Sequence, residues 1–164
     1  MRVCGIIAEY DPFHLGHLHH LQEARRLSGA DYVVCVISTA FTQRGLPGMF
    51  STFDRARMAL LAGADLVLGI PVSWSCAQAN RFAAGGIGIL NGLGVVSHVA
   101  FGVEPATMPW LKRAAEELTA PSPAFAERLK QSLDRGHSMA RAQGEALMEA
   151  MPAASAPLLN CPNF

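Results

Sequence analysis

The sequence predicts a Rossmann-like three-layer α/β domain with a parallel sheet, followed by a C-terminal helical appendage. In the first part of the chain of 164 residues, short apolar runs alternate with amphipathic helical patterns, and the connections between them are short. This alternation requires right-handed crossovers and therefore a parallel sheet with helices on both faces. Only helical patterns remain afterwards. We therefore expect an α/β core at residues 1–105 and a helical extension at residues 106–164.

Four apolar runs are predicted to form the strands of the sheet. Residues 3–8 and 32–38 read Val-Cys-Gly-Ile-Ile-Ala and Tyr-Val-Val-Cys-Val-Ile-Ser, without polar alternation. Continuous runs of this kind are typical of strands that helices cover on both faces. Two further strands are predicted at residues 66–70 and 95–101.

Helices are predicted between these strands and after the last of them. The first begins at about Leu15 and stops at Ser28-Gly29, and the second follows Ser51, which begins a capping box that Asp54 completes. A third helix, at residues 77–93, contains four glycines, so we expect it to pack closely against another element. Amphipathic patterns continue at residues 107–118, 122–135 and 138–151.

Composition limits the classes of protein to which the chain can belong. With 51% hydrophobic and 16% charged residues, the chain can build one substantial core. Thirteen basic and thirteen acidic residues cancel, so no overall field indicates a nucleic-acid or membrane partner. No apolar stretch reaches about 18 residues, and the N-terminus lacks the order of a signal peptide. We therefore expect a cytosolic protein without a membrane partner.

Cysteines and carboxylates do not predict a metal site. The four cysteines, Cys4, Cys35, Cys76 and Cys161, are widely scattered. Two of them fall inside predicted buried strands, where a thiol behaves as a small apolar group. We expect neither a disulfide framework nor a metal-ligand set.

The segment between the first strand and the first helix is the candidate site. Residues 9–20 read Glu-Tyr-Asp-Pro-Phe-His-Leu-Gly-His-Leu-His-His and lie at the carboxyl end of a predicted parallel strand, where such sheets bind ligands. A helix N-terminus favours an anion such as phosphate. Gly16 allows the backbone to come close, and His14 and His17 can donate hydrogen bonds to phosphate oxygens. His19 and His20 are interpreted as surface or core-edge residues.

The same segment resembles the HIGH-type nucleotidyltransferase superfamily through His14-Leu15-Gly16-His17. Residues 5–17 are more specifically similar to the opening of the tRNA(Met) cytidine acetate ligase family, whose signature is Glu-Tyr-Asn-Pro-Phe-His-x-Gly-His. Further matching motifs are Gln43-Arg44-Gly45-x-Pro47, Arg55-Ala56-x-Met58-Ala59-Leu60, Gly63-Ala64-Asp65-Leu66-Val67, Ile70-Pro71-Val72, Leu90-Asn91-x-Leu93-Gly94-Val95 and Phe101-Gly102-x-Glu104.

This resemblance implies an activity. The family uses ATP to convert acetate to acetyl-adenylate and transfers the acetyl group to the wobble cytidine of elongator tRNA(Met). ATP and acetate are therefore the expected small ligands, with Mg²⁺ accompanying the nucleotide. A tRNA partner is expected for the full-length family, although this chain shows no RNA-binding pattern of its own.

The resemblance also implies roles for particular residues. His14 and His17 would stabilise the α-phosphate, and Arg44 would meet the triphosphate or the RNA backbone. Gly102 would contact the adenosine, and Asn163 would match a later nucleotide contact. The ATP-binding loop would consist of Ile7, Ala8, Glu9, Tyr10, Asp11, Pro12, Phe13, His14, Leu15, Gly16, His17, Leu18, His19 and His20.

Some positions depart from the family pattern. Asp11 replaces an asparagine and brings an anion near the phosphate site, which weakens binding unless a cation or the backbone offsets it. Leu46, Thr52 and Val103 also differ from the usual residues. The family's enzymes are about twice as long, so we expect either the front part of a longer protein or a shortened one. Arg55 and Arg57 are interpreted as part of a solvated helix face.

Three interpretations of function remain open. The chain is the catalytic front domain, or a shortened relative, of an acetate ligase. Alternatively, it is an adenylyltransferase for a small phosphorylated cofactor precursor. The third possibility is a nucleotide-binding module without catalytic activity.

Overall fold

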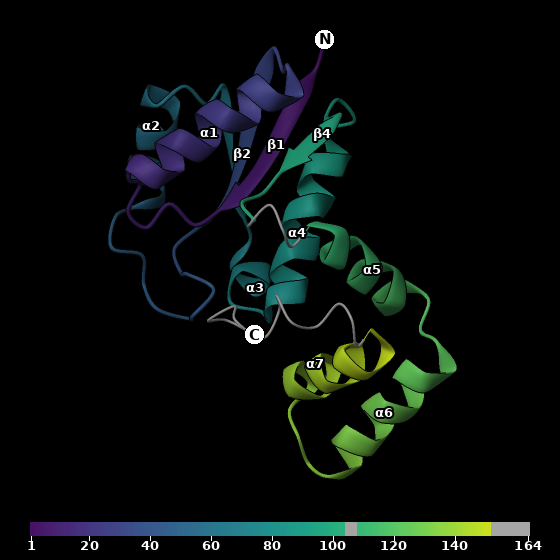
Figure 1. The fold of residues 1–164 in the computed structure, drawn as a ribbon. Helices are drawn as coiled ribbons and strands as arrows, with labels where there is room; N and C mark the ends of the chain where they lie inside the picture. Colours follow the sequence, from purple (N-terminus) through teal and green to yellow (C-terminus); the bar gives the residue numbers. More distant parts are fainter. Residues whose placement is uncertain (104–107, 152–164) are drawn as a thin grey trace. The chain divides into compact units, whose positions relative to one another are not determined.

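A computed structural model describes residues 1–103 and 108–151 of the chain (Figure 1). The chain divides into two compact units, Met1–Gly102 and Val103–Phe164. The first is an α/β unit and the second contains helices. Glu104, Cys161 and Asn163, which the sequence analysis singled out, lie outside the described residues.

The first unit contains a four-stranded parallel sheet, which confirms the predicted fold class. Its strands are β1 (Val3–Ala8), β2 (Tyr32–Ser38), β3 (Leu66–Ile70) and β4 (His98–Ala100), in the order β3-β2-β1-β4. All three neighbouring pairs run parallel. The first three strands have the predicted bounds.

The fourth strand is shorter than the predicted run of residues 95–101. Gly94 has a positive φ of 68°, so the chain turns just before that run. Ser97 then donates its backbone N–H to the carbonyl of Val3, and only the next three residues join the parallel ladder. Residues 95–97 of the apolar run therefore lead into the strand and are not part of it.

Helices cover the two faces of the sheet. The helices of this unit are α1 (Leu15–Ser28), α2 (Thr52–Leu61), α3 (Val72–Ser75) and α4 (Ala79–Gly92). Leu21 of α1 and Ala59 of α2 share a buried cluster with Ile6, whereas Leu90 of α4 shares another with Val3. Successive side chains of a strand point to opposite faces, so α1 and α2 lie on one face and α4 on the other (Figure 1).

Helix α4 packs closely against the strands, as its glycines predicted. A Cβ atom on Gly86 would lie 2.6 Å from Ile7 Cδ1, and one on Gly5 would lie 2.5 Å from Leu90 Cδ1. Neither glycine can therefore gain a side chain without a shift of the helix or of the neighbouring residue. The helix persists despite four glycines because this packing compensates for their low helix propensity.

The strand order locates the ligand-binding edge of the sheet. The chain passes from β1 to β2 to β3 and then crosses to β4, on the other side of β1. The order thus reverses between β1 and β4. Ligands of such sheets bind beyond the carboxyl ends of the strands near this reversal. The His14–His17 segment follows β1 after residues 9–13 and therefore lies at this edge.

The second unit contains the three predicted helices. They are α5 (Met108–Thr119), α6 (Pro123–Asp134) and α7 (Met139–Ala150). Phe125 and Leu147 are central in their shared core, which Ala114, Ala146 and Met151 complete. No helix in the described parts of the two units is long and apolar enough to span a membrane.

Candidate active site

His14 and His17 cap the N-terminus of α1 reciprocally. Nδ1 of His14 accepts a hydrogen bond from the backbone N–H of Gly16 at 3.1 Å. Nδ1 of His17 accepts one from the backbone N–H of His14 at 3.3 Å. The two imidazole rings stack with centroids 3.7 Å apart and an interplanar angle of 22°. The sequence therefore forms a capping box from two histidines, where serine and glutamate are more usual.

These hydrogen bonds determine where each imidazole carries its proton. A neutral histidine whose Nδ1 accepts a hydrogen bond has its hydrogen on Nε2. Both His14 and His17 therefore present an Nε2–H donor. Two Nε2–H donors at the N-terminus of a helix, which carries partial positive charge, are suited to an anion.

Burial and the neighbouring histidines favour the neutral form of His17. Desolvation lowers the pKa of His17 below its usual value of 6.5, and the nearby His14 and His20 lower it further. The ring of His17 meets the ring of Tyr10 edge-on, with centroids 4.9 Å apart, and lies 5.6 Å from that of Phe13. His17 thus rests against an aromatic wall and does not move freely in solvent.

Tyr10 forms the base of this wall. It is fully buried and has a φ of 53°, in the left-handed region that residues other than glycine seldom adopt. Its hydroxyl lies 3.4 Å from the sulfur of Cys35 in β2, and burial raises the pKa of that hydroxyl. The strained backbone directs the side chain into the core and lets the chain turn from β1 towards α1.

The structure shows that Arg55 is not on a solvated helix face, so that interpretation is wrong. Its side chain is 0% exposed and lies under the carboxyl ends of β1 and β2. The burial of Arg55 was not predicted from the sequence because its hydrogen-bond partners are distant in the chain. Its position in the helix could have indicated burial, because Arg55 lies one helical turn before the buried Ala59 and therefore on the same face. Arg57 is exposed, as expected.

The carboxylate of Asp11 is engaged by the protein itself. Its Oδ1 accepts the backbone N–H of Met49 at 2.7 Å and lies 3.8 Å from Nε of Arg55. A neighbouring carboxylate, that of Glu9, accepts the backbone N–H of Gln43 at 2.5 Å. The anion introduced at position 11 is thus offset by a cation and by the backbone, the two means that the sequence analysis named.

Arg44 lies in a tight turn beyond β2. Thr42 donates its backbone N–H to the carbonyl of Leu46, and Gly45 has a φ of 75°. Phe41 and Pro47 pair across the base of the turn. Arg44 is exposed at the tip. Glu9 connects the turn to the end of β1 through the neighbouring Gln43, so both segments belong to one edge of the sheet.

The predicted ATP loop contains inward-facing and outward-facing residues. Ile7 packs on the α4 face, and Tyr10 is fully buried and faces the core. His19 is exposed, and His20 is half-buried with an Nε2 atom that has no hydrogen-bond partner among the described residues. Gly102 is exposed at the end of the first unit.

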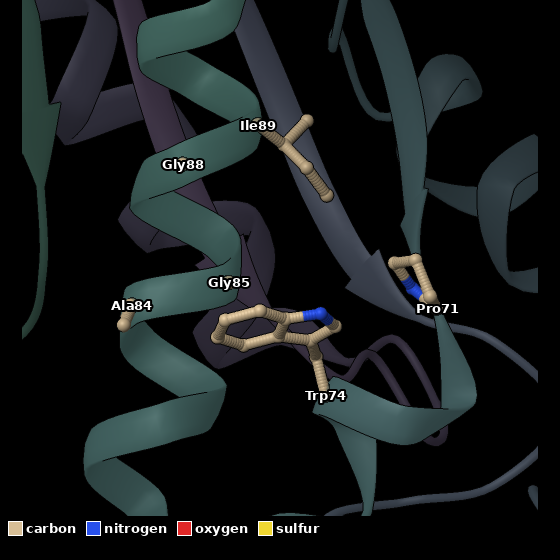
Figure 2. A pocket seen from close by; sticks show the side chains of 6 residues that line it. All are labelled: Pro71, Trp74, Ala84, Gly85, Gly88 and Ile89. Atoms are coloured by element: carbon tan, nitrogen blue, oxygen red, sulfur yellow. The ribbon is translucent and has the colours of Figure 1, made fainter.

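A separate apolar hollow lies beside Trp74, on the α4 face (Figure 2). Its volume is about 270 Å³, and it is lined by Pro71, Trp74, Ala84, Gly85, Gly88 and Ile89. The indole packs on the bare backbone of Gly85, and the guanidinium carbon of Arg81 lies 5.5 Å from the ring centroid. None of the lining residues is charged, so the hollow does not suit a triphosphate.

Comparisons with known proteins establish the family of the chain. A family described as HIGH Nucleotidyl Transferase matches residues 1–164. The chain belongs to the HIGH nucleotidyltransferase family. The resemblance inferred from the histidine motif is thereby confirmed.

Curated relatives within the HIGH nucleotidyltransferases carry a more specific name. A protein of Acetivibrio thermocellus named tRNA(Met) cytidine acetate ligase is 45% identical over 147 residues, which cover 90% of this chain and 35% of the relative. One with the same name from Fervidobacterium nodosum is 43% identical over 151 residues, or 92% and 36% of the two chains. The chain thus spans about a third of the length of these relatives.

A solved structure has the same fold. It is Thermotoga maritima TmcAL bound with alpha-thio ATP, which is 39% identical with a TM-score of 0.88. The match covers 93% of this chain and 37% of that one. The TmcAL crystal structure without ligand matches equally well, with a TM-score of 0.88.

Proposed function

We propose that this chain binds ATP and forms acetyl-adenylate, as the adenylating part of a ligase that acetylates the wobble cytidine of elongator tRNA(Met). The observation that carries the proposal is the pair of Nε2–H donors on His14 and His17 at the N-terminus of α1. The ATP analogue in the TmcAL structure and the name of the curated relatives support it.

The proposed reaction is an in-line displacement at the α-phosphorus of ATP. A carboxylate oxygen of acetate forms the new bond to phosphorus, and the bond from phosphorus to the bridging oxygen breaks as pyrophosphate leaves. Negative charge grows on the non-bridging oxygens in the transition state. Donors aimed at such oxygens are each worth about 3–4 kcal/mol. His14 and His17 would supply these donors without giving up a proton.

The other predicted residues would hold the nucleotide in place. Residues 7–20 would form the loop that binds ATP, with Gly16 allowing close approach of the phosphates. Gly102 would contact the adenosine, and Asn163 would add a later contact. The exposed Arg44 would meet the triphosphate or the RNA backbone. Transfer of the acetyl group to tRNA belongs to the same proposal.

The resemblance also implies Mg²⁺ with the nucleotide. Residues 1–103 and 108–151 contain no group of three or more His, Cys, Asp and Glu side chains placed to hold a metal ion. The carboxylate of Asp11 already accepts the backbone N–H of Met49 and faces Arg55. These residues therefore do not form a protein site for the ion.

Isotope exchange between pyrophosphate and ATP tests the proposal. We expect exchange that depends on acetate, because the formation of acetyl-adenylate from ATP and acetate releases pyrophosphate and is reversed by it. The double variant His14→Ala/His17→Ala should abolish it. Exchange that requires a phosphorylated acceptor and not acetate would indicate a small-molecule adenylyltransferase. ATP binding without exchange for any acceptor would indicate an inactive nucleotide-binding module.

A further inference from the structure

The guanidinium of Arg55 connects segments that are far apart in the sequence. Nη1 donates to the carbonyl of Glu9 at 2.7 Å and to the hydroxyl of Ser38 at 3.1 Å. Nη2 donates to the carbonyl of Thr39, and Nε donates to that of Phe50 at 3.2 Å. One side chain of α2 thus joins the ends of β1 and β2 to the loop that precedes α2.

These contacts require an arginine. Burial of a cation is unfavourable unless its hydrogens are bonded, and an arginine can direct five N–H donors in a fixed plane. A lysine offers three donors from one point and cannot reach acceptors on three segments at once. An apolar side chain would often be at least as stabilising in such a place. The network is therefore better explained by the geometry that it imposes than by stability.

That geometry reaches the histidines through a short and tightly held path. Glu9 is five residues before His14. Between them, Tyr10 is buried in a left-handed conformation, and Asp11 is bound to the loop at residues 39–50. The rings of Tyr10 and Phe13 then lie against His17. Because the residues between Glu9 and His14 are held by these contacts, we expect a displacement of Glu9 or Asp11 to change the direction of both imidazoles.

We propose that Arg55 is a positioning residue for the adenylation reaction. It holds the segment of residues 9–13 against the loop at residues 39–50, so that His14 and His17 face the α-phosphate and the turn bearing Arg44 faces the same ligand. Because Arg55 is fully buried, it acts through these segments and does not touch the nucleotide. The kinetic part of this inference rests on the proposed function.

Arg55→Lys, with Arg57→Lys as a matched control, tests the inference. Both changes keep the charge and lie on α2, but Arg57 is exposed. We expect Arg55→Lys to lower kcat of the acetate-dependent exchange at least about tenfold while the Kd for ATP changes less than about threefold, because misplaced donors fail mainly in the transition state. Arg57→Lys should retain the kinetics of the unchanged protein. Unchanged kcat in a folded Arg55→Lys variant overturns the proposal.

Amide hydrogen exchange provides a readout that does not depend on activity. We expect Arg55→Lys to raise the exchange rates of the amides of Gln43 and Met49, which bind Glu9 and Asp11. The central amide of Val34 in β2 should keep its protection. If the unchanged protein shows no exchange between pyrophosphate and ATP, the proposed function fails. The amide exchange rates of Gln43 and Met49 still decide whether Arg55 holds the two segments. Unaltered protection at both amides overturns the inference.

Two further variants keep the test decisive if Arg55→Lys does not fold. Ser38→Ala removes one acceptor from the network, and we expect a loss of kcat of about threefold with normal thermal unfolding. Arg55→Ala opens a cavity that guanidinium can fill. Added guanidinium should restore kcat in a saturable way, whereas equimolar sodium should not. Full activity of Ser38→Ala together with an absence of rescue overturns the proposal.

Discussion

At the carboxyl ends of β1 and β2, distant segments are joined by hydrogen bonds around a buried cation, whereas α4 meets β1 through the bare backbone of a glycine. Arg55 and Asp11 represent the first region. Gly86 against Ile7 represents the second. The first depends on the directions of donors and acceptors, and the second depends on volume.

The two regions therefore govern different properties: the first governs the orientation of the site residues, and the second governs the stability of the first unit. A hydrogen-bonded edge can be disturbed without loss of the core, because the strands beneath it remain packed. A close apolar contact cannot accept a methyl group without a shift that weakens the whole unit. Substitutions at the edge should therefore alter chemistry, and those beneath α4 should alter the free energy of unfolding.

The largest effect is expected at the histidine pair. His14→Asn keeps an N-cap acceptor for Gly16 but removes the Nε2–H donor, so we expect the exchange rate to fall about 10²–10³-fold with little change in stability. His17→Ala should cost a similar factor. Isotope exchange and thermal unfolding measured on the same samples check this. A His14→Asn variant with full activity would show that the donor is not used.

A smaller effect is expected beneath α4, this time on stability. Gly86→Ala places a Cβ 2.6 Å from Ile7 Cδ1, and we expect a loss of about 1–3 kcal/mol in the free energy of unfolding. Gly88→Ala is the matched control in the same helix, because nothing lies within 4 Å of its added Cβ. It should gain up to about 1 kcal/mol from helix propensity. Urea unfolding distinguishes the two, and equal stability of the variants would contradict the close packing.

Asp11→Asn sharpens the comparison at the polar edge. The amide oxygen of the asparagine can still accept the N–H of Met49, but the site loses one negative charge. Repulsion between that charge and a nearby phosphate is worth about 1 kcal/mol in a water-like dielectric, and less because Arg55 offsets part of it. We expect the Kd for ATP to fall about fourfold by calorimetric titration. A weaker affinity would mean that Asp11 serves mainly to hold the loop.

The pH dependence of stability gives the smallest expected change. Because the pKa of His17 is lowered in the folded protein, the unfolded chain binds the proton first as the pH falls below about 6.5. The contribution of His17 to stability is therefore complete above that pH and decreases towards its lowered pKa. The melting temperature of the first unit should fall between about pH 7.5 and 5.5, and it should fall less in His17→Gln. A larger fall in His17→Gln would contradict the shift.

Much of the fold could be predicted because its signals are local. β1 and β2 are continuous apolar runs, which are typical of strands covered on both faces, and their bounds agree with the structure. The glycines of α4 correctly indicated close packing. The short helix α3 was not predicted, because its four residues are too few to show a helical period. The beginning of β4 was predicted too early, because the residues that lead into the strand are also apolar and continue its pattern.

The candidate site was only partly predictable for the opposite reason. His14, Gly16 and His17 are adjacent in the sequence, so their grouping at a helix N-terminus could be inferred. The role of Arg55 depends on carbonyl groups at residues 9, 39 and 50, which come together only in the folded chain. The hydrogen bonds that assign the proton of each imidazole to Nε2 also became clear only from coordinates.

The most direct test of the central claim is a long-range ¹H–¹⁵N NMR spectrum of the histidine side chains, recorded with and without ATP. We predict that the Nδ1 atoms of His14 and His17 resonate as unprotonated nitrogens and their Nε2 atoms as protonated ones, and that ATP shifts both Nε2–H signals. Protons on Nδ1, or Nε2–H signals that do not respond to saturating ATP, would contradict the claim that these two donors bind the phosphate.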